Sequence, residues 1–223
     1  RIGLDIMEVA PAPLLALTKI QRDEIAAAAK ANNIELTFSV GLGLDQDLAS
    51  EDETIRKNGI KFTTDAFKVM SEMGAKMYSG VDIAAWNKTF TEGIIDKSAA
   101  WERSILAVKE IMKSAEDMGI TFAVEVVNRY ESSLVNTAEE AIKYVDEVDS
   151  PNCKILLDTY HMNIEEDSFA GAIRSVGSRL GHFHVGECNR KPPNEQGKMP
   201  WDEITQGVNI LLNFFFGPVV NAA

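Results

Sequence analysis

The sequence predicts an α/β fold, a single (β/α)8 TIM barrel over residues 1–223, from two observations. Short apolar runs alternate with longer stretches of helical periodicity, and no linker or low-complexity tract interrupts them. Repeated strand–helix units indicate parallel strands, which form either an open doubly wound sheet or a closed barrel. The barrel is favoured because the nearest match to a nucleotide-binding turn, Gly41-Leu42-Gly43, lacks a third glycine and a following helix.

Each expected element rests on its own local pattern. Apolar runs predict strands at 2–9, 34–40, 75–81, 121–127, 154–157 and 180–185, with 217–221 as a candidate last strand. Helical periodicity predicts helices at about 22–33, 55–73, 99–118, from 137 onward, 168–176 and 201–212. Gly119 suits the residue after the third helix, and Thr137 with Glu140 forms a capping-box pattern at the start of the fourth.

The length predicts an incomplete barrel. A full one needs about 250 residues, and this chain has 223. Its first residues, Arg1-Ile2-Gly3-Leu4-Asp5, already have the pattern of the interior of a strand. The barrel's first strand is therefore expected to be missing. The last βα unit is expected to be missing or aberrant as well, because the run Asn213-Phe214-Phe215-Phe216 fits such a unit poorly.

Composition excludes several classes of function. The net charge of −12 leaves no basic stripe for phosphates, so no nucleic acid is expected as a partner. No apolar run is long enough to span a bilayer, and no membrane association is expected. Cys153 and Cys188 lack CxxC spacing, which argues against a disulfide framework. The default compartment is therefore the cytoplasm.

Three polar residues stand where predicted strands end, which is where barrels carry their chemistry. Glu125 lies within FAVEVV at 122–127, Asp158 closes ILLD at 155–158, and His184 follows His182 in GHFHV at 181–185. A lone acid at a strand end is often only a helix cap or an ion-pair partner. Three such residues at intervals of about one βα unit favour a shared metal or catalytic site for Mn²⁺, Co²⁺ or Mg²⁺. Strand alternation places both histidines on one face, with His184 as the better ligand and His182 as a hydrogen-bonded interior residue.

Three longer stretches resemble signatures of the D-tagatose/D-psicose (allulose) 3-epimerase family. They are VEVVNRYE at 124–131, LDTYHMNIEE at 157–166 and GHFHVGECNR at 181–190. Similarity extends back through WERS at 101–104 and DIMEVA at 5–10, and forward to PWDEI at 200–204. The resemblance covers roughly residues 2–205. The chain is also similar, more distantly, to the wider xylose-isomerase-like group of barrels.

The resemblance implies metal-dependent epimerisation of free ketohexoses such as D-psicose, D-fructose and D-tagatose at C3, through a cis-enediolate. Glu125, Asp158 and His184 would hold Mn²⁺ or Co²⁺, and Glu125 would also act as a catalytic acid/base. The substrate's O1–O3 end would be held by Glu131, His161 and Arg190, with Trp86 lining the sugar pocket. The family forms dimers or tetramers, so a homodimer or homotetramer is expected.

The chain departs from the family pattern near its end. The family supplies a second carboxylate from its last strand, both as fourth metal ligand and as the source of the second proton. No Asp or Glu follows Glu203 in this sequence, and Ala222 stands at the aligned position. This 223-residue chain is therefore expected to bind metal weakly and to epimerise ketoses very poorly.

Two other readings stay open at this point. The first is a related barrel isomerase, of the hydroxypyruvate isomerase or inosose dehydratase type, although the loops around His161 and Arg190 look more like those of the 3-epimerases. The second is a non-catalytic fragment that binds metal or sugar, which the absent final carboxylate would favour. A substrate panel separates the first reading from a 3-epimerase.

Overall fold

The computed structural model describes residues 3–89, 96–193 and 199–216, the last seven without their side chains. All six of its strands are parallel and pair in sequence order. They are β1 (Ile6–Val9), β2 (Glu35–Gly41), β3 (Met77–Val81), β4 (Thr121–Glu125), β5 (Cys153–Asp158) and β6 (Leu180–His184). Sequential order distinguishes a barrel from a doubly wound sheet, whose strand order reverses part-way.

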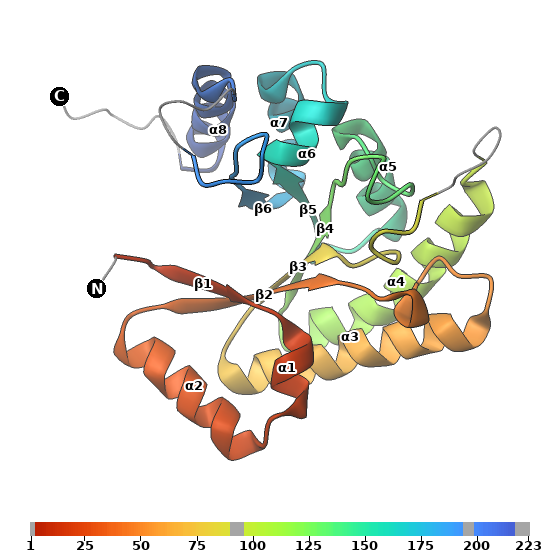
Figure 1. Ribbon diagram of the computed structural model, residues 1–223, viewed down its shortest axis with the longest axis vertical. Coiled ribbons are helices and arrows are strands. Elements are labelled where there is room, and N and C mark those ends of the chain that lie inside the picture. Colours follow the sequence, from red (N-terminus) through yellow and green to blue (C-terminus); the bar gives the residue numbers. More distant parts are fainter. Residues whose placement is uncertain (1–2, 90–95, 194–198, 217–223) are drawn as a thin grey trace.

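Helices cover the outer side of the curled sheet, and its concave side opens between β1 and β6 (Figure 1). The helices are α1 (Pro11–Ala16), α2 (Lys19–Ala31), α3 (Glu53–Met73), α4 (Ser98–Met118), α5 (Ala138–Val148), α6 (Thr159–Glu165), α7 (Phe169–Val176) and α8 (Trp201–Phe216). The arc is that of a partial TIM barrel, so the predicted barrel is confirmed. No helix in the described part of the chain is long and apolar enough to cross a membrane.

Most predicted elements coincide with observed ones, and the differences have local reasons. The first strand begins only at Ile6, and the strand expected over 121–127 ends at Glu125. Helices α1 and α6 were not predicted, because six and seven residues are too short to display a helical period. The candidate strand at 217–221 and Ala222 lie outside the described residues.

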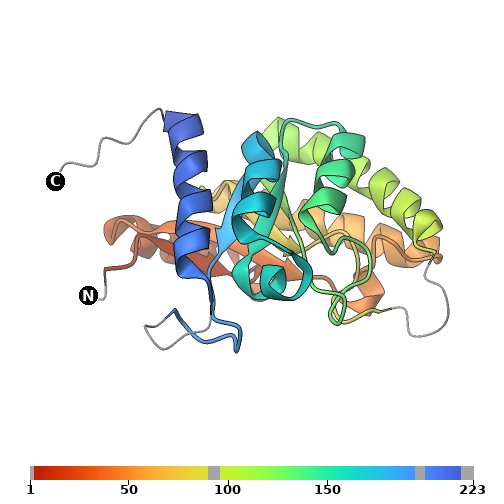
Figure 2. The same ribbon diagram turned by 90° about the horizontal axis from the view of Figure 1, so that it is seen from above.

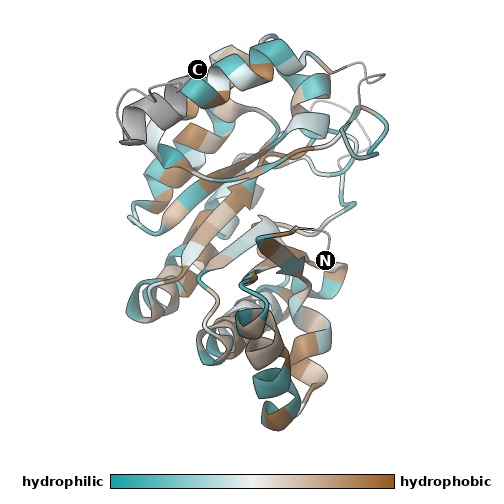
Figure 3. Cartoon of the chain, turned by 90° about the vertical axis from the view of Figure 1, so that its left-hand side faces the viewer, coloured by the Kyte–Doolittle hydropathy of each residue, from teal (hydrophilic) through white to brown (hydrophobic). Residues whose placement is uncertain are grey.

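An aromatic cluster joins the sheet to α3. Phe67 of α3 packs edge-on against Tyr78 of β3, with ring centroids 5.2 Å apart. Tyr78 stacks on Phe122 of β4 at 5.8 Å, and all three side chains are fully buried. Figure 3 shows the resulting pattern, with brown strands and helices banded in brown and teal. The core therefore lies between the sheet and its helices, which leaves the concave face for polar side chains.

Helix ends set where the neighbouring strands begin. Gly119, at φ 61°, ends α4 in the left-handed conformation and turns the chain into β4. Thr137 accepts a hydrogen bond from the backbone N–H of Glu140, as the capping-box pattern predicts. Oε2 of Glu140 accepts a hydrogen bond from the N–H of Asn136. In a standard capping box this bond comes from the N-cap residue itself, here Thr137.

One irregularity in the sheet decides which side chains meet. Ile155 of β5 pairs with Leu180 of β6, but the next residue, Leu156, pairs with His182, so Gly181 is an extra residue in β6. A Cβ at Gly181 would lie 2.5 Å from Cβ of Lys154, so the close approach there requires glycine. Beyond this bulge, Asp158 is the register partner of His184.

Helix α8 packs against α7. Seen from above, α7 and α8 run side by side (Figure 2). A Cβ at Gly207 of α8 would lie 2.9 Å from Cδ1 of Ile173 and 3.2 Å from Cα of Ala170. The glycine thus permits the two helices to pack closely, and Glu203 adds a 2.5 Å hydrogen bond from the Ser168 hydroxyl.

Candidate metal centre

The three predicted ligands lie together at the carboxyl ends of neighbouring strands. Glu125 is the last residue of β4, Asp158 of β5 and His184 of β6. Nδ1 of His184 is 3.7 Å from Oδ2 of Asp158 and 3.9 Å from Oε1 of Glu125. Parallel strands bring these ends to one edge, and the structure places the three predicted side chains near one another.

The site holds more negative charge than its surroundings compensate. The side chain of Asp158 is only 15% exposed. Burial raises the pKa of its carboxyl, and the neighbouring Glu125 carboxylate raises it further. Oδ1 of Asp158 accepts the 2.7 Å hydrogen bond from the Tyr160 N–H that caps α6, which leaves Oδ2 directed at His184. Two partly buried carboxylates and an imidazole suit a divalent transition metal with mixed oxygen and nitrogen ligands.

His161 also lies beside Glu125, and its hydrogen bonds argue against a ligand role. The backbone N–H of Asn128 donates to Nδ1 of His161 at 3.2 Å, so that nitrogen is an acceptor. A neutral imidazole then carries its proton on Nε2, which lies 3.4 Å from Oε1 of Glu125. His161 therefore presents an N–H donor to the site, whereas Nδ1 of His184 faces the two carboxylates.

A cluster of polar side chains around Glu131 adjoins the three predicted ligands. Glu131 accepts hydrogen bonds from Nε1 of Trp86 at 3.0 Å and from Nδ2 of Asn128 at 3.1 Å, and it forms an ion pair with Arg190. Burial opposes ionisation of Glu131, but the bonds from Trp86 and Arg190 outweigh it and hold the pKa below its usual value. Asn128 also contacts His161 at 2.7 Å, so it links this polar cluster to the predicted metal centre.

Two loops position the outer side chains of this polar cluster. Arg190 adopts φ 61°, a left-handed conformation that is strained for a side chain of this size, and its guanidinium lies 4.1 Å over the ring of Tyr160. Trp86 is 45% exposed and covers Gly41 at the end of β2, where a Cβ would lie 2.8 Å from Cε3 of the indole. Trp86, Glu131, His161 and Arg190 are thus brought together, as the resemblance implies.

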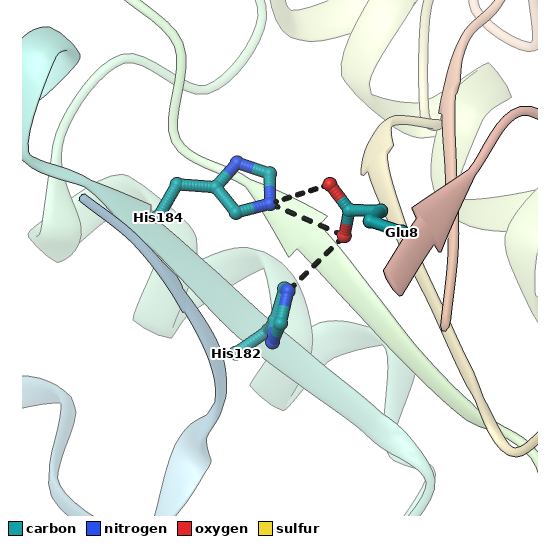
Figure 4. Close-up of side chains that lie close together, drawn as sticks. All are labelled: Glu8, His182 and His184. Carbon is teal, nitrogen blue, oxygen red and sulfur yellow. Dashed lines mark hydrogen bonds and ion pairs between the residues drawn. The ribbon is translucent and has the colours of Figure 1, made fainter. Parts of the chain in front are cut away.

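Sequence analysis did not single out Glu8 or Asp82. Glu8, on β1, contacts His182 and His184 across the concave face (Figure 4). Its signal was a lone carboxylate inside the apolar run IMEV. Asp82 follows β3, is fully buried, and has no hydrogen-bond partner among the residues that the structure describes. No sequence pattern indicates that an acid after a strand turns inward.

A cavity of about 440 Å³ lies elsewhere, between the loops that follow β2, β3 and β4. Its lining includes Asp47, Lys88, Arg103 and Ser132 but none of the predicted site residues. Asp47 is 1% exposed and ties two of these loops together, since its Oδ1 accepts from the N–H groups of Ala49 at 2.9 Å and Ala85 at 3.1 Å. The cavity therefore borders the loop scaffold and not the metal centre.

Comparison with known proteins assigns the family. The xylose isomerase-like TIM barrel family profile matches residues 1–211. A D-psicose 3-epimerase of Ruminiclostridium cellulolyticum is 45% identical over 208 residues, covering 93% of this chain and 70% of that protein. A D-psicose 3-epimerase of Agrobacterium fabrum is 37% identical, covering 92% and 70%. A crystal structure of the Clostridium cellulolyticum D-psicose 3-epimerase with D-tagatose superimposes with a TM-score of 0.89 at 45% identity, covering 94% of this chain and 72% of the other. The chain therefore belongs to the xylose isomerase-like TIM barrel family, with ketose 3-epimerases among its relatives.

Proposed function

We propose that this chain is a metal-dependent isomerase that inverts C3 of free ketohexoses of the D-psicose, D-fructose and D-tagatose type. The observation that carries the proposal is the convergence of Glu125, Asp158 and His184 at the ends of three consecutive strands. Relatives that are 45% and 37% identical are named D-psicose 3-epimerases, which supports the same substrate class.

Glu125, Asp158 and His184 would hold the ion, for which Mn²⁺ or Co²⁺ is proposed and Mg²⁺ is an alternative. When bound, a divalent cation polarises the C2 carbonyl and stabilises negative charge that develops on O2 and O3. His161 presents its Nε2 proton toward the same region and would donate a hydrogen bond to a substrate oxygen. These groups lower the energy of a cis-enediolate without forming a covalent bond to the sugar.

Glu125 is the proposed acid/base. The proton on C3 lies α to a carbonyl, and a carboxylate above one face of that carbon can remove it. The Glu125 side chain is 10% exposed and lies 3.4 Å from Nε2 of His161, so its orientation is fixed before substrate binds. Inversion also requires a proton delivered to the opposite face, and this chain's turnover measures how well that occurs.

Glu131, His161 and Arg190 would bind the O1–O3 end of the sugar, and Trp86 would cover its apolar face. Arg190 and the Trp86 indole both contact Glu131, so the pocket is organised before a sugar enters. An aromatic face beside a carboxylate and a guanidinium suits a polyhydroxylated ligand, because the ring contacts C–H groups while charged groups pair with hydroxyls.

The decisive assay is epimerisation of D-fructose and D-psicose by the metal-free chain with added Mn²⁺ or Co²⁺. Because no Asp or Glu follows Glu203, only slow turnover is expected; EDTA should abolish it, and Glu125→Gln should lower it at least about 100-fold. Glu139→Gln, at an exposed site on α5, is the matched control and retains activity. Metal-independent turnover, or an active Glu125→Gln, would contradict the proposal.

A substrate panel then sets specificity. Relatives that are 36% and 31% identical are named L-ribulose 3-epimerases, so L-ribulose is tested beside the hexoses. Hydroxypyruvate and an inosose test the other barrel isomerases considered above. The expected homodimer or homotetramer stays a prediction, which light scattering after size-exclusion chromatography checks.

A further inference from the structure

We infer that Glu8 is a positioning residue for His184, and that it fixes the imidazole so that Nδ1 faces the proposed metal. The inference rests on the proposed metal centre and adds to it a residue from the opposite edge of the sheet. Glu8 lies on β1, whereas His184 ends β6, and the two strands do not pair with each other. The curl of the sheet is what brings them together (Figure 4).

The contacts of Glu8 occupy both of its oxygens. Oε1 lies 3.1 Å from Nε2 of His184, and Oε2 lies 3.3 Å from the same nitrogen. Oε2 also lies 3.1 Å from Nε2 of His182. On its other side, the ring of His184 presents Nδ1 to Asp158 at 3.7 Å and to Glu125 at 3.9 Å. Each nitrogen of His184 therefore has its own carboxylate environment.

The chemistry of imidazole explains how Glu8 can orient His184. A neutral histidine has one N–H and one lone pair, and only the lone pair binds a metal. Donation from Nε2–H to Glu8 places the lone pair on Nδ1 and fixes the rotation of the ring, an arrangement common in metalloproteins. Without Glu8, the ring of His184 could rotate or carry its proton on Nδ1, and both changes remove a ligand.

The same three side chains could instead hold an ion themselves, because Glu8, His182 and His184 lie within ligand distance of one another. His184 cannot serve both positions, since a neutral ring has a single lone pair. The Nδ1 side offers two carboxylates and the Nε2 side offers one. A divalent cation is better neutralised by two, so the structure favours Glu8 as the orienting partner and not as the ligand.

The test measures Mn²⁺ affinity of the metal-free chain by isothermal titration calorimetry. Glu8→Ala removes the acceptor, and its affinity is expected to fall about 10- to 100-fold. Glu8→Gln keeps an acceptor but loses the charge, and a smaller loss of about 3- to 10-fold is expected. His182→Asn is the matched control, because it breaks the other contact between β1 and β6 while Glu8 still reaches His184. Its affinity should stay within about 2-fold, since no ligand is disturbed.

A second readout separates orientation from general loosening. The absorption bands of bound Co²⁺ report ligand geometry, and we expect them to change in Glu8→Ala but not in His182→Asn. If Glu8→Ala does not fold, Glu8→Gln decides the question by its own affinity. Unchanged affinity in Glu8→Gln and Glu8→Ala, or an equal loss in His182→Asn, would overturn the inference while leaving the metal centre intact.

Two further outcomes bear on the proposed function. Asp158→Asn is expected to weaken Mn²⁺ binding strongly. If it binds normally while Glu8 and His182 variants do not, the ion sits on the Nε2 side, and both the inference and the proposed centre fail. A wild-type chain that binds no Mn²⁺ also overturns both. Failure of Glu8 alone is therefore distinguishable from failure of the centre.

Discussion

Asp82, a buried carboxyl after β3, gives the sharpest test of the structure. Its carboxyl is fully buried and unpartnered among the described residues, so burial, with a smaller contribution from Glu125, raises its pKa well above the ordinary value. The folded chain then holds a proton that the unfolded chain releases near pH 3.9, the usual pKa of an aspartate. The contribution of this group to the free energy of unfolding is complete below that pH. It is lost as the pH rises toward the pKa of Asp82 in the folded chain.

The magnitude follows from linkage. One proton of difference changes the free energy of unfolding by about 1.4 kcal/mol per pH unit. From pH 4.5 to pH 6.5 the wild-type chain should therefore lose stability relative to Asp82→Asn, which cannot ionise, by up to about 2.7 kcal/mol for as long as the folded carboxyl keeps its proton. The two chains should be closest in stability below about pH 3.9, where Asp82 is protonated in both the folded and the unfolded state.

The assay is urea unfolding of both chains at pH 4.5, 5.5 and 6.5, monitored by circular dichroism. Taking the difference between the two chains cancels the titrating groups that do not interact with Asp82. Asp117→Asn, on the exposed side of α4, is the matched control for removing a carboxylate. A difference between wild type and Asp82→Asn that stays constant within about 0.5 kcal/mol over the range would refute the reasoning. It would mean that Asp82 is ionised and has found a partner.

Three further substitutions test the packing of the strands and of the loops that follow them. Gly80→Ala is expected to cost at least about 2 kcal/mol in thermal unfolding, because φ is +117° and a Cβ would lie 2.2 Å from the carbonyl oxygen of Val40; an unchanged melting temperature would contradict this. Gly41→Ala should displace Trp86, 2.8 Å from the new Cβ, raising KM for the ketose with the fold intact, and unchanged kinetics and indole fluorescence would count against the proposed pocket. Asp47→Ala leaves two buried N–H donors without an acceptor and should cost about 2–4 kcal/mol in urea unfolding, whereas a neutral effect would show that water replaces the carboxylate.

The strands and long helices could be predicted because their signals are local. Apolar runs mark the buried strands, and the glycine at 119 marks the end of α4. The convergence of Glu125, Asp158 and His184 could be predicted too, since a parallel barrel brings consecutive strand ends to one rim. The resemblance to the 3-epimerases supplied the proposed roles of Glu131, His161 and Arg190, which strand patterns alone do not give.

The contacts that could not be predicted depend on curvature and register. The meeting of Glu8 with His184 requires the sheet to bend until its first and last strands face each other, and no local pattern encodes that distance. The argument for His184 over His161 as the proposed ligand depends on one hydrogen bond, from the backbone N–H of Asn128 to Nδ1 of His161. Asp82 was missed because an acid after a strand normally reaches solvent.

The extra glycine in β6 makes the site depend on the register of one strand. Side chains alternate between the two faces of a strand, so a shift of one residue exchanges the faces. If β6 paired with β5 residue by residue from Leu180, without the bulge, Phe183 would lie beside Asp158 and His184 would turn toward the helices. The proposed ligand set would then be broken without any change to its residues. A substitution at Gly181, whose Cβ would lie 2.5 Å from Cβ of Lys154, could thus disable the site from a position that carries no chemistry of its own.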